Sequence, residues 1–130
     1  MSEHNNDEFW NRQFDVGGNI PGLWFDVAFS LRTAADVLER FKGPHMFEFK
    51  ANVTRSDCKK QSVARVQPML LAMATECLLK ALWLKYGGIL AEGGTYHPIP
   101  KAPNHRLDLL AKAVSEKGDI KFTREEIELL

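Results

Sequence analysis

The chain has 130 residues, with 17 basic and 17 acidic side chains and a formal net charge of zero at pH 7. Fractions of 45% hydrophobic and 26% charged residues are those of an ordinary globular protein, and they exclude collagen-like, disordered and disulfide-framework proteins. Zero net charge gives no overall field that draws the chain onto nucleic acid or a membrane, so a site for a polyanion must be local.

The N-terminal residues 1–20 are predicted to form a polar tail, partly docked, and residues 21–130 a single helical-bundle domain. The tail is expected to end in a turn at Gly17 and Gly18, and its aromatic residues suggest the docking. Its acidic, polar start differs from the basic and then apolar run of a signal peptide. Cys58 and Cys77 have no CxxC spacing, which favours a reducing, cytoplasmic setting.

Apolar residues at helical spacing predict a first helix that starts at Pro21 and ends before Gly43. A connection over residues 43–60 leads to a second, strongly apolar helix from about Lys60 to Tyr86, in which Pro68 predicts a kink. Glycines and prolines over residues 87–104 predict a long irregular loop.

A third helix is expected over roughly residues 106–116, with Asn104 as its N-cap and Gly118 as its C-terminal cap. Thr123 and Glu126 form a capping-box pattern that opens a fourth helix. That helix is still amphipathic at Leu130, so either a short helix ends the protein or the chain is cut short there. Together these elements predict an all-α, four-to-five-helix up-and-down bundle.

The second helix carries a charged pair, Glu76 and Lys80, one turn apart among apolar residues. A helix that is apolar almost all round is expected to be buried, and buried charges are costly unless they are paired or used. About twenty residues after the end of the stretch Thr75–Lys85, His105 opens the third helix. A structural ion pair that locks the second helix against the third is the alternative to a functional site.

The stretch Ala74–Leu82, ATECLLKAL, together with His105 and the leucines at 107, 109 and 110, resembles the HEPN (higher eukaryotes and prokaryotes nucleotide-binding) superfamily. These are small helical bundles found in bacterial defence and toxin-antitoxin systems and beside nucleotidyltransferases. The resemblance implies a nucleotide- or RNA-related binding module without catalysis of its own. It departs from many members because Arg106 follows the histidine directly, and the acid comes later as Asp108.

On this reading the ligand-binding residues are Glu76, Lys80, His105, Arg106 and Asp108, with Lys80 holding phosphate and Glu76 orienting the base or the imidazole. Arg106 and Asp108 are also expected to be exposed. No metal-ligand spacing, P-loop or dinucleotide fingerprint is present, so neither a metal nor a cofactor is expected.

Two alternatives remain open. Superfamily members that act as metal-independent ribonucleases carry Arg-x4-6-His, which here matches only Arg40 and His45; the histidine would act as general acid and base and the arginine would stabilise phosphate. The other alternative is a helical scaffold that binds a protein partner. A homodimer is also expected, because the second helix is apolar on more than one face.

Overall fold

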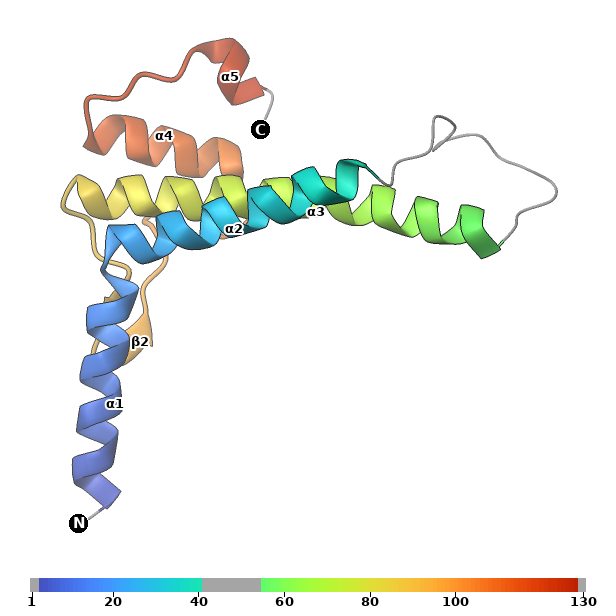
Figure 1. The fold of residues 1–130 in the computed structure, drawn as a ribbon. Coiled ribbons are helices and arrows are strands. Elements are labelled where there is room, and N and C mark those ends of the chain that lie inside the picture. The colour runs from blue at the N-terminus through green and yellow to red at the C-terminus, as the bar shows by residue number, and fades with distance from the viewer. Residues whose placement is uncertain (1–2, 41–54, 129–130) are drawn as a thin grey trace.

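The computed structural model describes residues 3–40 and 55–128 (Figure 1). They form five helices and one two-stranded hairpin, so the protein is mostly helical. In chain order the elements are α1 (Glu3–Gly18), α2 (Pro21–Glu39), α3 (Arg55–Lys85), β1 (Ala91–Glu92), β2 (Thr95–Tyr96), α4 (Leu107–Lys117) and α5 (Arg124–Glu128).

The long helices α2 and α3 lie side by side, and α4 packs against α3 (Figure 1). The two buried residues of α2 are Ala28 and Ala35, whose small side chains let the helices approach closely. Gln67 of α3 is buried at this contact, and its Nε2 donates to the carbonyl oxygen of Ala35 over 3.3 Å and to Glu39. The pair α2–α3 is therefore the frame on which the other elements are placed.

The hydrophobic core lies between the C-terminal half of α3, the following loop and α4. Leu90, Leu110 and Val114 are its largest fully buried side chains. Trp24, Trp83 and Tyr86 are half-buried and pack against this core.

The first helix, α1, replaces the polar tail that the sequence predicted over residues 1–20. It projects from one end of the α2–α3 pair (Figure 1) and packs on the hairpin. The Asp15 carboxylate accepts hydrogen bonds from the backbone N–H groups of Gly93 and Gly94, at 2.9 and 2.7 Å. Between α1 and α2, the Oδ1 of Asn19 accepts from the N–H groups of Leu90 and Ala91, and its Nδ2 donates to the Ala91 carbonyl.

The hairpin lies within the segment that was expected to be an irregular loop. Ala91 pairs with Tyr96 and Glu92 with Thr95, which leaves Gly93 and Gly94 as a two-residue turn. Both glycines have positive φ angles, 63° and 74°, as a type I′ turn requires. A Cβ on Gly94 would also meet the Asn11 side chain at 2.2 Å, so this turn fixes the distance between the hairpin and α1.

Helix boundaries agree with the sequence at several points and differ at others, since α3 begins at Arg55, before the expected start at about Lys60. The start of α2 at Pro21 and the end of α3 just before Gly87 are as predicted, and Pro68 lies inside α3. The capping box of α5 is confirmed, since Thr123 Oγ1 accepts from the Glu126 N–H while the Glu126 carboxylate accepts from the Thr123 N–H.

The prediction that Asn104 is the N-cap of α4 is wrong. Arg106 occupies that position, and its side chain makes no capping hydrogen bond to the backbone of the helix. Asn104 instead accepts a hydrogen bond from the Tyr96 hydroxyl over 3.0 Å. Among the helices of the described residues, none has both the length and the apolar character that crossing a bilayer requires.

Candidate functional site

Glu76, Lys80 and His105 lie together where α3 meets the segment that leads into α4. The Lys80 Nζ donates to Glu76 Oε1 over 2.7 Å, and His105 Nδ1 lies 2.8 Å from Glu76 Oε2. An ionised carboxylate only accepts hydrogen bonds, so Nδ1 carries the proton and the Nε2 of a neutral ring is left with its lone pair. We call these three residues the 76–80–105 cluster.

The three members differ in exposure, and this decides what each can do. The side chains of Glu76 and Lys80 are 9% and 8% exposed, whereas that of His105 is 83% exposed. A ligand from solvent therefore reaches the imidazole, and the carboxylate and ammonium lie behind it. Glu76 can orient the imidazole, as the sequence predicted. Lys80 was expected to hold phosphate, but its ammonium is buried and bonds to the Glu76 carboxylate.

Two aromatic rings surround the Lys80 ammonium. Its Nζ lies 5.1 Å from the centroid of the Trp24 ring and 5.2 Å from that of Tyr96. Cation–π attraction of this kind is strongest where the cation is desolvated. Trp24 belongs to α2 and Tyr96 to β2, so both elements contact the cluster. Trp24 also donates its indole N–H to the carbonyl of Gly18, the last residue of α1, over 2.9 Å.

Charge interactions overcome the effect of burial on both buried groups. Burial raises the pKa of the Glu76 carboxyl, but hydrogen bonding to Lys80 and the charges of Lys80 and His105 bring that pKa below its usual value. Burial lowers the pKa of the Lys80 ammonium, but its interactions with Glu76 and Tyr96 bring that pKa above its usual value. Both groups are therefore charged at neutral pH.

The depressed pKa of Glu76 leads to a prediction about acid stability. A carboxyl whose pKa is lower in the folded than in the unfolded state stabilises the fold fully above its unfolded pKa, and this stabilisation is lost as pH falls through the folded pKa. Between about pH 6 and about pH 3, the free energy of unfolding should thus fall more steeply for the wild type than for Glu76→Gln, measured by urea titration. Glu116→Gln, which removes an exposed carboxylate of α4, should show the same dependence of unfolding free energy on pH as the wild type. Equal slopes for Glu76→Gln and the wild type would contradict the prediction.

The backbone at His105 is in the left-handed region, with φ of 68°. A residue with a Cβ rarely adopts this conformation, and it persists only where the surroundings enforce it. Here the ring of His105 is bonded to Glu76 in this conformation. The residue lies just before the first turn of α4, whereas the sequence predicted that it would open that helix. Such strained residues cluster at functional sites.

Arg106 and Asp108 do not join the cluster. They pair with each other on the surface, with Arg106 Nη2 2.9 Å and Nε 3.1 Å from the two carboxylate oxygens, as their expected exposure suggested. Asp108 also supplies the negative charge that the N-terminal turn of α4 favours.

The proposed nuclease pair is only partly described. Arg40 is the C-cap residue of α2 and is exposed, whereas His45 lies outside the described residues. His97 is exposed in the loop after β2, where its Nε2 lies 3.3 Å from the Glu92 carbonyl oxygen. Within residues 3–40 and 55–128, no group of three or more His, Cys, Asp or Glu residues is arranged to hold a metal ion.

Sequence reasoning missed the roles of Trp24, Tyr96 and Asn104 around the cluster. Tyr96 lies in the stretch 87–104 that was predicted to be an irregular loop, and nothing in the spacing of Trp24 pointed to the cluster. Their convergence on Lys80 depends on the hairpin and on the α2–α3 contact, which join residues far apart in the chain. The paired glycines at 93 and 94 were the one local signal for that hairpin.

Comparison of the chain with protein-family models, with curated proteins and with solved structures finds no match.

Proposed function

We propose that the chain is a HEPN-like, nucleotide- or RNA-related binding module in which His105 contacts a phosphate group of the ligand. The observation that carries the proposal is an exposed imidazole whose Nδ1 is held by a buried carboxylate, on a strained backbone. The choice of a nucleotide or RNA rather than another anion comes from the sequence resemblance.

The residues divide into two groups on this proposal. His105 and the neighbouring Arg106, whose side chain is exposed and keeps free N–H donors beyond its bonds to Asp108, contact the ligand. Glu76 fixes the direction of the imidazole, and Lys80 keeps Glu76 ionised and in place. An imidazole that gains a proton as the phosphate arrives would form a charge-assisted hydrogen bond to it.

A thermal-shift titration with nucleoside monophosphates, nucleoside triphosphates and short RNA tests the proposal. The wild type should be stabilised in proportion to the logarithm of ligand concentration, by about 2.7 kcal/mol at a hundred times the Kd. His105→Gly should lose this shift. Glycine is the right replacement because it accepts the positive φ freely, whereas alanine would keep the backbone strain of about 1 kcal/mol and lose the ring that bonds to Glu76.

Lys101→Gly is the matched control, because Lys101 is exposed and has a φ of 61°, close to that of His105. This variant undergoes the same kind of backbone change and should keep the full ligand shift. If the wild type shows no shift with any of these ligands, or if His105→Gly shifts as much as the wild type, the cluster is a structural cross-link and the chain is an interaction bundle.

A further inference from the structure

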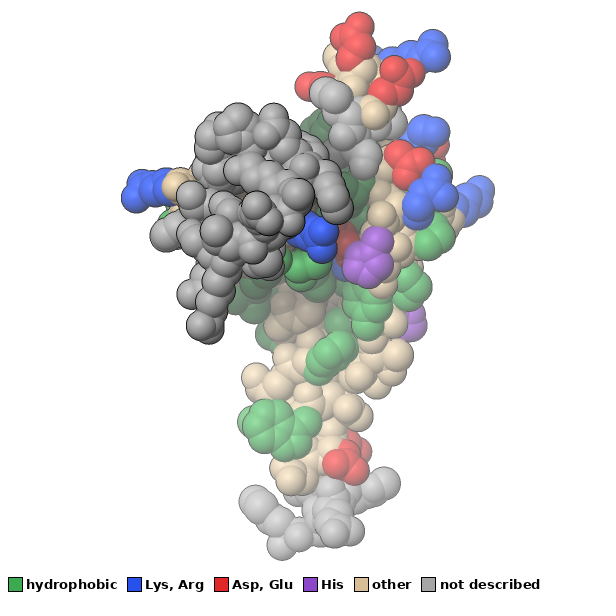
Figure 2. Space-filling model, turned by 90° about the vertical axis from the view of Figure 1, so that its right-hand side faces the viewer, with side chains coloured by type: hydrophobic (Ala, Val, Ile, Leu, Met, Phe, Trp, Pro, Cys, Tyr) green, Lys and Arg blue, Asp and Glu red, His purple; other side chains and the backbone are tan. Residues whose placement is uncertain are grey.

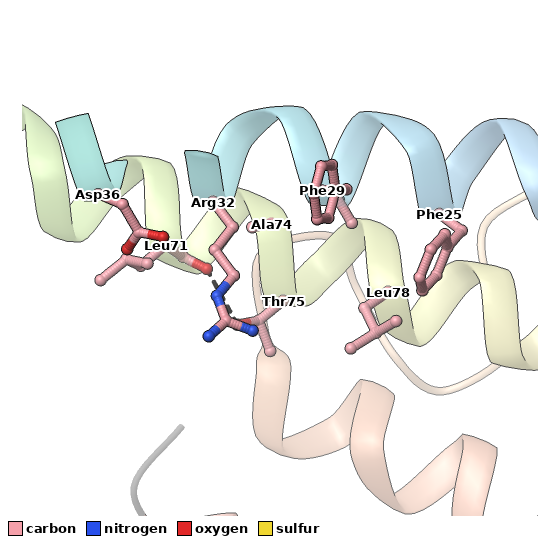
Figure 3. A pocket seen from close by; sticks show the side chains of 9 residues that line it. Phe25, Phe29, Arg32, Asp36, Leu71, Ala74, Thr75 and Leu78 are labelled. Carbon is pink, nitrogen blue, oxygen red and sulfur yellow. Dashed lines mark hydrogen bonds between the residues drawn. The ribbon is translucent and has the colours of Figure 1, made fainter. Parts of the chain in front are cut away.

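The helices α2 and α3 leave an apolar groove between them that is separate from the 76–80–105 cluster. The groove encloses about 490 Å³, and Phe25, Phe29, Leu71 and Leu78 form its apolar walls (Figure 3). All four side chains are exposed, Phe29 most of all at 65%. Soluble monomers rarely leave a continuous apolar surface of this kind uncovered, so the groove is a candidate contact surface.

Two charged residues of α2, Arg32 and Asp36, lie at one end of the groove (Figure 3). Both are exposed, and neither has an ion-pair partner among the described residues. An occupant that suits this groove therefore has an apolar face and charges of both signs beside it.

The projecting helix α1 has these features. Phe9, Trp10 and Phe14 are each about half exposed or more, at 53%, 60% and 47%. Apolar side chains stand out from this arm of the molecule in Figure 2. Next to them along α1 lie exposed charges of both signs, namely Asp7, Glu8 and Arg12, which make no ion pair within the part of the chain that the structure describes.

We propose that α1 of one copy docks in the α2–α3 groove of a second copy, and that the exchange is reciprocal. Asp7 of α1, on the side of the helix that carries Phe14, then has Arg32 as a partner, and Arg12 has Asp36. Within one copy this contact is not made, because Asp15 and Asn19 fix the C-terminal end of α1 to the hairpin and α1 points away from the groove (Figure 1).

The areas involved favour a two-way exchange over a single contact. The exposed parts of the three aromatic side chains, each about half of its surface, bury on the order of 300 Å² together, which is short of the roughly 800 Å² per partner of a stable complex. In a reciprocal pair each copy contributes one arm and one groove, so the contact area doubles. A two-fold arrangement of this kind also closes and leaves no groove free for further copies. The inference does not depend on the function proposed for the 76–80–105 cluster.

The test is the molar mass in solution, measured by sedimentation over a range of protein concentrations. The wild type should be a dimer. Trp10→Asp, which changes the arm, and Phe29→Asp, which changes the groove, should each raise the dimer dissociation constant more than tenfold. Val27→Asp is the matched control, because Val27 is 49% exposed on the opposite side of α2 from Phe29 and should leave the dimer intact. Circular dichroism and a cooperative melt verify that each variant is folded.

Mixing the two variants distinguishes arm exchange from other dimers. The Trp10→Asp copy keeps its groove and the Phe29→Asp copy keeps its arm, so one intact contact forms when they pair. The mixture should therefore contain dimers at a concentration where neither variant alone does. A monomeric wild type, a Trp10→Asp variant that remains a dimer, or a mixture without dimers would each overturn the proposal.

Discussion

Replacing Glu76 with leucine is expected to lower the free energy of unfolding by about 3 to 5 kcal/mol, the usual cost of removing one partner of a buried ion pair. Lys80 would remain as an ammonium with no carboxylate within reach, in a side chain that is 8% exposed. His105 would lose the acceptor that holds its Nδ1 at the same time. Urea unfolding at neutral pH measures the loss.

The double variant Glu76→Leu, Lys80→Met separates this cause from a simple packing defect. It removes both charges and keeps similar side-chain volumes, so no charge is left buried without a partner. Its stability should return to within about 1 to 2 kcal/mol of the wild type, since apolar replacements of whole buried ion pairs are often nearly neutral. A double variant as unstable as Glu76→Leu alone would mean that the loss does not come from an unpaired charge.

Replacing Asn19 with alanine is expected to cost about 2 to 4 kcal/mol, because it leaves three buried backbone groups without a partner. The N–H groups of Leu90 and Ala91 lose the Oδ1 acceptor, at 2.8 and 3.0 Å, and the Ala91 carbonyl loses a donor at 2.7 Å. Both residues are nearly inaccessible to solvent, so water cannot replace the amide without a rearrangement. Urea unfolding gives the free energy, and hydrogen exchange should show faster exchange of these two amides.

Asn19→Asp provides the matched comparison for that variant. Aspartate keeps an acceptor for both N–H groups but has no donor for the Ala91 carbonyl, so its cost should lie between those of wild type and Asn19→Ala. Unchanged exchange at Leu90 and Ala91 in Asn19→Ala would show that these bonds do not hold the hairpin.

The sequence predicted α2, α3, α4 and α5 because their signals are local. A proline at the start, glycines past the end and a capping box act within a few residues of the boundary they define. The helix α1 was missed because most of its residues are polar and its paired glycines suggested a turn. In the structure, Asp15 and the neighbouring Asn19 bind a hairpin more than seventy residues away, which no local pattern could show.

The candidate site likewise combines residues with a local sequence signal and contacts between distant parts of the chain. Glu76 and Lys80 could be identified because two charges at helical spacing within an apolar helix must be accounted for. His105 could be placed near them only through the resemblance, and the structure brings its ring to 2.8 Å from Glu76. The enclosure of Lys80 by Trp24 and Tyr96 was not predictable, because it depends on how three separate elements meet.

The attachment of α1 to the hairpin also determines when this helix can be fixed during synthesis. The bond from Asp15 to Gly93 spans 78 residues of chain. At about 5 to 20 residues per second, the ribosome needs roughly 4 to 16 seconds to make the residues in between. During that interval Asp15 and Asn19 do not yet have the backbone groups of residues 90–94 as hydrogen-bond partners. The helix α1 is therefore made seconds before the hairpin that fixes its C-terminal end, and it takes its final place only after the hairpin has been made.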